Sequence, residues 1–550
     1  MKLSSGILLA LACGASSKNV VEFSVTKSLP GIHVGSVPPL TRRETFSERL
    51  INNIAGGGYY VNVQVGTPPQ DLTMLLDTGS SDAWVLSHEA DLCTDRDLQS
   101  FYGTSCTDTY NPSKSSSRKM VKEKGFRITY LDGGTASGDY ISDDFTIGGT
   151  TVRSLQMACV TQALRGTGIL GLGFSISERA STKYPNIIDE MYNQGLIKSK
   201  AYSLYLNDRR TDSGSLLFGG IDTDKFIGRL GVLPLYKPPG GRNYSSFEVN
   251  FTSVSLTYAN GTQHTIPTSI LDHPAPAVLD SGTTLSYLPD KLVGPIDTAL
   301  GTFYDASLQM TLIDCFHPLL ETDPAFHLTF TFTPTTSITI PLADLILDIL
   351  PPSYPQPGSE PDDNSSSQGS TTTTTTTTQK NKACVFGIQS TDRFAASFKQ
   401  KEANFTLLGD TFLRSAYVVY DLSHYQIGLA QANLNSSSIP YSPGSSGKSN
   451  SNTIIELIAG DGTSDSGTGT GTDGEGGGGR GGLPSGLMGV SAQQTTFTPT
   501  ATATAPSGHG GQNAAAGGST TKKKSLIGEV IGVAVVTVLF TLLGGALIAV

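Results

Sequence analysis

Two short segments of the sequence carry the residue types needed for acid–base chemistry. They read Leu-Leu-Asp-Thr-Gly-Ser-Ser at 75–81 and Val-Leu-Asp-Ser-Gly-Thr-Thr at 278–284. In each segment an apolar run ends on an aspartate, Asp77 or Asp280, and glycine and hydroxylated residues follow. Two carboxylates that share one proton can activate a water molecule to attack a peptide carbonyl. The pattern therefore indicates a hydrolytic site in which the two aspartates act as a pair.

The residues around each aspartate suit this role. Gly79 and Gly282 allow tight turns and leave backbone N–H groups free to bond the carboxylates. Ser80 and Thr283 can donate hydrogen bonds to the outer carboxylate oxygens. A further hydroxylated residue directly follows each aspartate: Thr78 and Ser281. One such triplet would be weak evidence, but two copies about 200 residues apart favour one site between two similar domains.

The elements that must position this pair are predicted to be mainly strands. Apolar runs before each aspartate predict buried strands that hold the carboxylates rigidly. Alternating patterns predict further strands at 59–65, 126–130, 202–206, 247–258, 327–333 and 416–421. Only two helical stretches stand out, near 185–197 and 289–300. The sequence therefore predicts an all-β fold with two β-rich lobes.

The flanks of the two aspartates resemble those of the pepsin-like aspartic proteases. Tyr-Val-Asn-Val-Gln-Val-Gly-Thr-Pro-Pro-Gln (60–70) leads into Asp77, and Trp84, the only Trp, follows it. The stretch 126–138 looks like the family's flap hairpin, with Tyr130 as the flap tyrosine. Two apolar-apolar-Gly segments look like those that support the catalytic loops: 168–173 and 406–414. The resemblance runs from about residue 58 to about residue 432.

The resemblance implies a bilobal fold with the active site between the lobes. It implies that Asp77 and Asp280 are catalytic, that Trp84 packs beneath Tyr130, that the substrates are proteins or peptides, and that no metal or organic cofactor is needed. The implied supporting residues are Thr78, Gly79, Ser80, Ser281, Gly282 and Thr283. The implied disulfides are Cys93–Cys106 and Cys315–Cys384.

Some positions depart from the family or keep two interpretations open. Leu131 follows the flap tyrosine where the family usually has Gly, and the second triplet is Asp-Ser-Gly. Tyr130 is either an aromatic packed on a sheet or the flap residue, and the turn sequence Asp-Gly-Gly at 132–134 favours the flap. Cys159 is either a buried thiol, which we favour, or a reactive one. No Cys/His spacing resembles a zinc site.

Charge and composition limit which functions and structures are compatible with the rest of the chain. The 550 residues carry a formal net charge of −10, which disfavours nucleic-acid binding. Acidic residues at 89–97 beside Cys93 could favour Lys or Arg in a substrate, or could belong to a solvated loop without a role. The stretch 436–520 is too poor in apolar residues to bury a core, and we expect it to be extended or disordered. A Pro-, Ser- and Thr-rich insertion at 352–382 interrupts the second lobe.

The N-terminal region carries processing signals. Residues 1–15 read as a secretory signal peptide. A propeptide at 16–43 would end at the dibasic pair Arg42-Arg43, and the catalytic lobes would then span 44–235 and 236–435. The alternative is that the pair is simply two solvated arginines. Six Asn-x-Ser/Thr sequons fit secretion: Asn243, Asn250, Asn260, Asn364, Asn404 and Asn435.

The C-terminal region matches a GPI-attachment signal. A Ser/Thr/Gly-rich stalk at 436–513 precedes small residues, a spacer with three lysines, and an apolar run at 526–550. We take Asn513 as the attachment residue, with Gly517 second, so that 514–550 would be removed. A retained transmembrane span is the alternative, but its flanking lysines would face the lumen.

Together these features predict a monomeric aspartic endopeptidase that is active in acid and held at the cell surface by a GPI lipid. A pepsin-like enzyme with such a stalk and signal looks like the fungal yapsin group, which works at the plasma membrane or in the cell wall. Two alternatives remain: a non-catalytic wall protein on the same fold, and a transmembrane processing protease of the secretory pathway.

Overall fold

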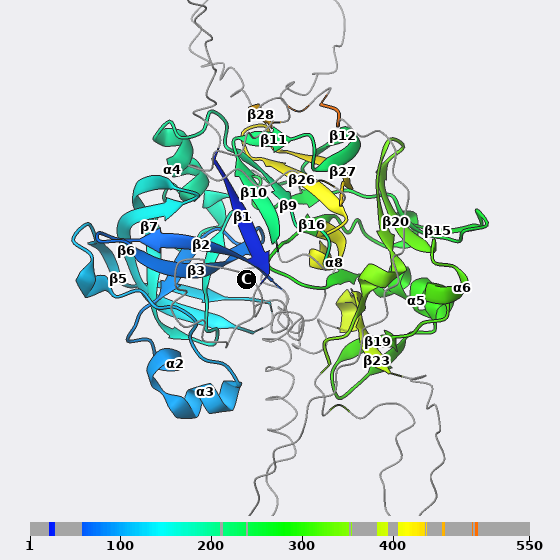
Figure 1. Ribbon diagram of the computed structural model, residues 1–550, viewed down its shortest axis with the longest axis horizontal. Helices are drawn as coiled ribbons and strands as arrows, with labels where there is room; N and C mark the ends of the chain where they lie inside the picture. Colours follow the sequence, from blue (N-terminus) through cyan, green and yellow to red (C-terminus); the bar gives the residue numbers. More distant parts are fainter. Residues whose placement is uncertain are drawn as a thin grey trace, which may run out of the picture.

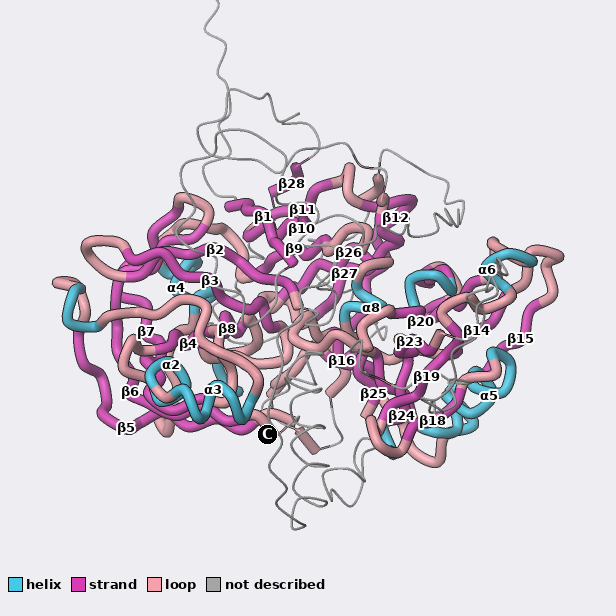
Figure 2. The backbone as a smooth tube through the Cα atoms, turned by 60° about the horizontal axis from the view of Figure 1, so that its bottom comes forward, coloured by secondary structure: helices cyan, strands magenta, loops and turns pink. Residues whose placement is uncertain are grey.

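The computed structural model describes most of the predicted catalytic region and a few short segments beyond it. The described residues are 21–27, 58–131, 133–209, 213–237, 240–241, 243–350, 354, 382–393, 405–434, 436, 454–456, 487 and 490–492. Figure 1 shows two lobes side by side, with early strands in blue and cyan and the second lobe in green. Figure 2 shows that strands dominate both lobes. The predicted all-β, bilobal architecture is therefore confirmed.

The largest sheet has 13 strands in the order β12-β27-β26-β9-β10-β1-β2-β3-β8-β4-β7-β6-β5. These strands are β1 (Val21–Lys27), β2 (Tyr59–Val65), β3 (Gln70–Asp77), β4 (Ala83–Leu86), β5 (Lys119–Thr129), β6 (Thr135–Ile147), β7 (Thr150–Ala163), β8 (Gly168–Gly171), β9 (Ala201–Tyr205), β10 (Ser213–Phe218), β12 (Phe226–Pro234), β26 (Ala416–Asp421) and β27 (Gln426–Ala432). Because β26 pairs with β9, the late strands of the chain complete the sheet of the first lobe.

Three smaller sheets build the second lobe. The five-stranded one is β13 (Glu248–Val249), β16 (Ala277–Leu279), β25 (Thr406–Leu408), β17 (Ser286–Leu288) and β24 (Ile388–Ser390). One four-stranded sheet is β15 (Gln263–Pro267), β14 (Ser253–Thr257), β20 (His327–Thr333) and β21 (Thr336–Pro341). The other is β18 (Phe303–Asp305), β19 (Met310–Asp314), β23 (Ala383–Phe386) and β22 (Ile346–Leu347).

The helices in the described part of the chain are short and lie outside the sheets. They are α2 (Asp91–Thr94), α3 (Arg96–Tyr102), α4 (Ile187–Asn193), α5 (Asp290–Leu300), α6 (Leu319–Thr322) and α8 (Asp410–Leu413), with 3₁₀ turns at Pro112–Lys114, Ser175–Ser177, Thr268–Ile270 and Leu342–Leu345. The predicted helices near 185–197 and 289–300 correspond to α4 and α5. Asn186 caps the start of helix α4, because its side chain accepts hydrogen bonds from the backbone N–H groups of Ile188 and Asp189.

The strands follow the alternation of the sequence, with one exception. Along β6, buried and partly exposed residues alternate almost without interruption, as expected for a strand with one face on the core. The predicted strand at 247–258 is wrong as one element. Its first part, β13, pairs with β16, whereas β14 pairs with β15 and β20 of another sheet, so the chain changes sheets at 250–252.

Both predicted disulfides are present, Cys93–Cys106 and Cys315–Cys384, with Cα–Cα distances of 5.1 Å. Cys159 is unpaired and buried. Burial raises the pKa of its thiol to about 12, so it stays protonated and has little nucleophilic character. This environment favours the structural interpretation of Cys159 over the reactive one.

Several predictions concern residues outside the described ones. They are the signal peptide, Arg42-Arg43, the sequons Asn364, Asn404 and Asn435, the attachment residues Asn513 and Gly517, and the apolar run 526–550. The other three sequons are exposed: Asn243, Asn250 and Asn260. Among the described helices, none combines the length and the apolar character needed to cross a membrane. The domain boundaries and the use of every sequon stay predictions.

Two segments lie where the sequence led us to expect something else. Strand β1 falls within the predicted propeptide, yet it pairs with β10 and β2 inside the largest sheet. Strand β28 (Ile454–Glu456) falls within the predicted stalk and pairs with β11 (Gly220–Asp222). The prediction that 436–520 is extended or disordered did not include this pairing of β28 with a strand of the catalytic body.

Candidate active site

The two aspartates stand at equivalent places in the two lobes. Asp77 ends β3, which pairs in parallel with β8, and Asp280 directly follows β16, which pairs in parallel with β25. Both side chains are fully buried. The segments 168–173 and 406–414 thus lie beside the catalytic loops, as their apolar-apolar-Gly pattern indicated.

Each carboxyl is held by the same pair of donors. The backbone N–H of Gly79 donates to Asp77 Oδ1 at 2.8 Å, and that of Gly282 donates to Asp280 Oδ1 at 2.8 Å. The hydroxyl of Thr283 donates to Asp280 Oδ2 at 2.5 Å, and the hydroxyl of Ser80 bonds Asp77 Oδ2. These are the bonds expected from the glycine and hydroxyl at the second and third positions after each aspartate.

The residue directly after each aspartate joins the two loops to each other. The Thr78 hydroxyl donates to the carbonyl of Leu279 at 2.9 Å, and the Ser281 hydroxyl donates to the carbonyl of Leu76 at 3.0 Å. The Ser281 backbone N–H in turn donates to the Thr78 hydroxyl at 2.9 Å. These hydrogen bonds between buried groups of the two lobes therefore fix the distance and orientation of the two loops.

Glycine is required where the loops approach each other. A Cβ atom at Gly79 would lie 2.7 Å from Asp280 Oδ1, which is closer than such atoms pack. On the supporting segment, a Cβ atom at Gly409 would lie 2.3 Å from the carbonyl oxygen of Thr283. Any side chain at either position would push the catalytic loops apart.

The electrostatics of the pair favour retention of a proton. Burial raises the pKa of the Asp77 carboxyl well above its usual range, and the neighbouring Asp280 carboxylate raises it further. Burial also raises the pKa of Asp280, against the hydrogen bonds from Thr283 and Gly282. Two carboxyls so close together cannot both ionise easily, so one of them keeps a proton that the other can share.

Tyr130 and Trp84 lie together near Asp77. The indole Nε1–H of Trp84 donates to the Tyr130 hydroxyl oxygen at 2.8 Å, and both side chains are buried. Burial raises the pKa of Tyr130 above its usual range, and the negative charge of Asp77 adds to this effect. The phenol therefore stays neutral and lies within electrostatic reach of the aspartate pair.

A family model for the eukaryotic aspartyl proteases matches residues 58–350 and 365–432. The chain belongs to this family. It is 36% identical over 383 residues to the probable aspartic-type endopeptidase opsB of Aspergillus oryzae, covering 69% of each chain. It is 30% identical over 400 residues to secreted aspartic protease 8 of Candida albicans, covering 73% of this chain and 82% of that protein. The protein is therefore an aspartic-type endopeptidase of the pepsin-like family, with fungal relatives.

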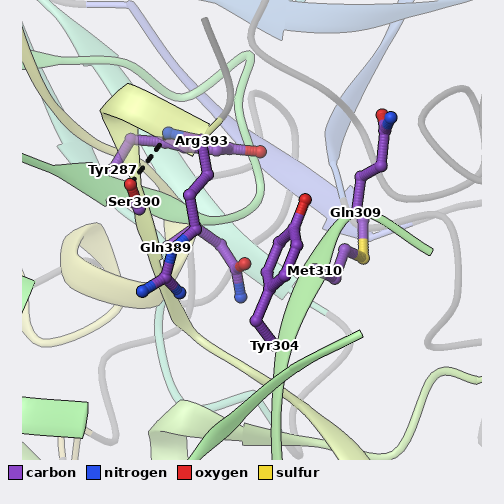
Figure 3. A pocket seen from close by; sticks show the side chains of 7 residues that line it. All are labelled: Tyr287, Tyr304, Gln309, Met310, Gln389, Ser390 and Arg393. Carbon is purple, nitrogen blue, oxygen red and sulfur yellow. Dashed lines mark hydrogen bonds between the residues drawn. The ribbon is translucent and has the colours of Figure 1, made fainter. Parts of the chain in front are cut away.

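The turn between β5 and β6, predicted to be the flap tip, reaches the second lobe. Leu131, the residue that departs from the family pattern, packs against an apolar cluster of the second lobe that includes Leu285 and Tyr287. Figure 3 shows the pocket beside this cluster, lined by Tyr287, Tyr304, Gln309, Met310, Gln389, Ser390 and Arg393. The guanidinium of Arg393 lies 5.1 Å from the centre of the Tyr304 ring. Leu131, at the turn between β5 and β6, thus packs on apolar side chains of the second lobe.

The acidic loop of the protease has local partners for part of its charge. Asp95 caps α3 by accepting hydrogen bonds from the N–H groups of Asp97 and Leu98 at 2.8 and 3.2 Å. Asp91 Oδ1 accepts from the N–H of Ala163 at 3.1 Å. These contacts favour a structural role for two of the carboxylates over a role in binding basic substrates.

Sequence reasoning missed one carboxylate close to the catalytic loop. Asp82 is buried and accepts hydrogen bonds from the hydroxyls of Tyr140 and Tyr184, each at 2.9 Å, and from the backbone N–H of Arg179. Its own carbonyl accepts from the N–H of Gly171 on the supporting segment. No local signal distinguished Asp82 from an exposed acidic residue, because acidic residues are ordinarily exposed.

One group of possible metal ligands occurs within the described residues: Cys315, Asp348 and Cys384. The two sulfur atoms form a disulfide and so are not available as thiolates. This group therefore does not fit a transition-metal site.

Proposed function

We propose that this endopeptidase acts at the cell surface in acid, with Asp77 and Asp280 as the catalytic pair. The observation that carries the proposal is the symmetry of the pair, in which two buried carboxyls have matching donors and loops that are joined to each other. In this mechanism the ionised aspartate takes a proton from water as general base. The protonated aspartate donates its proton to the substrate carbonyl oxygen as the water attacks.

The same pair accounts for an acid optimum. Catalysis requires one protonated and one ionised carboxyl, so activity falls at low pH when both are protonated and at high pH when both are ionised. Burial and mutual repulsion raise the pKa of the carboxyl that keeps its proton. The enzyme is therefore expected to stay active at pH values above the usual pKa of an aspartate. The residues hold and move these protons without a metal or organic cofactor, so we expect chelators to leave turnover unchanged.

The cell-surface location rests on sequence features and on the relatives. The terminal apolar run and small residues around Asn513 fit GPI attachment, and three exposed sequons fit passage through the secretory pathway. One relative is named a secreted aspartic protease. By its stalk and terminal signal the enzyme resembles the fungal yapsin group, at the plasma membrane or in the cell wall.

The catalytic proposal is tested by Asp77→Asn and Asp280→Asn in the secreted enzyme. An amide can neither share the proton nor act as base, so we expect kcat on a peptide at acid pH to fall by at least about a thousandfold. The matched control is Asp71→Asn, because Asp71 lies on the same strand as Asp77 but is exposed. Circular dichroism checks that each variant is folded. Substantial turnover by either folded variant would contradict the mechanism.

A further inference from the structure

The strands that join the lobes form a layer with two apolar faces. Along β26, Val418 and Tyr420 belong to the main core, and the Tyr420 hydroxyl donates to the carbonyl of Leu279, directly before Asp280, at 3.3 Å. The alternate residues Tyr417 and Val419 belong to a separate apolar cluster. Since neighbouring residues of a strand point to opposite faces, this second cluster lies on the side away from the catalytic loops.

A segment from far beyond the matched protease region covers this outer cluster. Leu487 is fully buried in it, and Val490 and Ala492 pack against it. The family match ends at residue 432, some 50 residues earlier. A leucine that is fully removed from water stabilises the surface that buries it, so this contact is expected to contribute to folding.

Backbone hydrogen bonds fix the same segment to the edge of β12. The N–H of Leu230 donates to the carbonyl of Val490 at 3.1 Å, and the N–H of Ala492 donates to the carbonyl of Gly228 at 2.7 Å. Arg229 and Ser491 are therefore paired as in an antiparallel ladder. An edge strand with open N–H and C=O groups is thereby covered by the chain's own tail.

A second attachment lies beside the first. Strand β28 pairs antiparallel with β11, with Ile455 opposite Ile221, and Ile221 belongs to the same outer cluster that Leu487 fills. Figure 1 shows β28, β11 and β12 grouped at one end of the joining strands. Two stretches of the predicted stalk therefore meet one surface of the catalytic body.

We propose that Ile454–Glu456, Leu487 and Val490–Ala492 form a C-terminal clasp, a structural part of the catalytic body whose binding surface is the outer cluster and the β12 edge. In this proposal the catalytic body extends at least to Ala492. The clasp itself does not depend on the anchor.

The test compares two secreted forms truncated after residue 495 and after residue 440. We expect both to cleave peptides with the same kcat/KM at low temperature, and the shorter form to unfold at least several degrees lower. In the longer form, Leu487→Ala should lower the apparent Tm by about 2 to 6 °C because it opens a cavity. The control Ser491→Asp, at an exposed position of the same segment, should shift it by less than about 1 °C.

Hydrogen exchange gives a second, independent measurement. The amides of Leu230 and Ala492 should be protected in the longer form, and Leu230 should lose protection in the shorter one. Equal Tm values for the two truncated forms, together with rapid exchange at both amides, would overturn the clasp. Failure of a phospholipase to release the full-length enzyme would contradict the anchor and leave the clasp intact.

Discussion

At the scale of single residues, Glu178 is a carboxyl whose burial has consequences for stability. Its side chain is 2% exposed, and its Oε2 accepts a hydrogen bond from the backbone N–H of Tyr184 at 2.9 Å. Burial raises the pKa of Glu178 to about 9. The folded protein therefore keeps this carboxyl protonated at a pH where the unfolded chain has released the proton.

This shift predicts that the enzyme loses stability as the pH rises. Between the unfolded pKa near 4.5 and the folded pKa of about 9, the folded state binds the extra proton, so the free energy of unfolding falls with pH. From pH 5 to pH 7 the loss is on the order of 2 kcal/mol. We expect Glu178→Gln to flatten the dependence of Tm on pH over this range, whereas the exposed control Glu123→Gln leaves it unchanged. An unaltered slope in Glu178→Gln would show that this carboxyl is not the cause.

The sequence predicted which residues bond the carboxyls, but not what joins the loops. Ser80 and Thr283 could be assigned because they stand at a fixed short distance from their own aspartates. The exchange of bonds between Thr78 and Ser281 could not, since it depends on how two segments about 200 residues apart meet in space. Burial of Asp82 and Glu178 was equally hidden, because acidic residues are ordinarily exposed.

At the scale of elements, the flap hairpin between β5 and β6 carries its own prediction. Leu131 packs on the second lobe while Tyr130 is held by Trp84, so the flap has an apolar contact that a glycine could not make. We expect Leu131→Gly to raise KM for peptides about five- to tenfold, because the hairpin loses roughly 1 to 1.4 kcal/mol of apolar contact with the second lobe when it covers the substrate site. The value of kcat should change less than about threefold, since no catalytic proton donor moves.

Leu131→Met separates this contact from general damage to the hairpin. Methionine keeps an apolar side chain of similar size and adapts to irregular surfaces, so KM should stay within about twofold of the natural enzyme. An unchanged or lowered KM in Leu131→Gly would mean that the flap tip does not help to hold the substrate.

The low-complexity insertion of the second lobe should be dispensable for catalysis. Its ends are fixed by structure, because the Tyr354 hydroxyl bonds Asp305 and Lys382 forms an ion pair with Asp348. We expect replacement of 355–381 by a short Gly/Ser linker to keep kcat/KM within about threefold, since loop-closure entropy depends only weakly on length. A large fall in activity with normal secretion would show that the insertion contributes to the substrate site.

Strand positions were predictable where one face of the strand is buried, and less so elsewhere. The alternation at 59–65 and 327–333 gave the bounds of β2 and β20, because period-two burial leaves a direct trace in the residue types. The change of sheet between β13 and β14 coincides with a shift of the apolar alternation from odd positions (Phe247, Val249, Phe251) to even ones (Val254, Leu256), which the prediction of a single strand overlooked. Strand β28 was missed because its short apolar run, Ile-Ile-Glu-Leu-Ile-Ala at 454–459, is surrounded by a long polar, glycine-rich stretch.

At the scale of the whole molecule, the repeated aspartate motif predicted two lobes. It did not predict that late strands of the chain pair with strands of the first lobe. Strands β26 and β27 lie between β9 and β12 in the largest sheet. The sheet is therefore complete only when the last part of the matched region has paired with it. Pairings of such long sequence separation are set by packing in three dimensions and leave no local pattern. The C-terminal clasp adds a later segment to the same set of strands.

The anchor gives the last prediction, which concerns the full-length enzyme on cells. Transfer to GPI requires small residues, a polar spacer and a terminal apolar run, and all three occur between residue 513 and the end of the chain. We therefore expect the full-length protein to stay with the cells until phosphatidylinositol phospholipase C or wall digestion frees it in active form. The form truncated after residue 495 should appear in the medium without either treatment, with its clasp and aspartate pair intact. If full-length protein resists both treatments and still contains residues 526–550 by mass spectrometry, the terminal run is a retained membrane span, and the enzyme is a transmembrane protease instead.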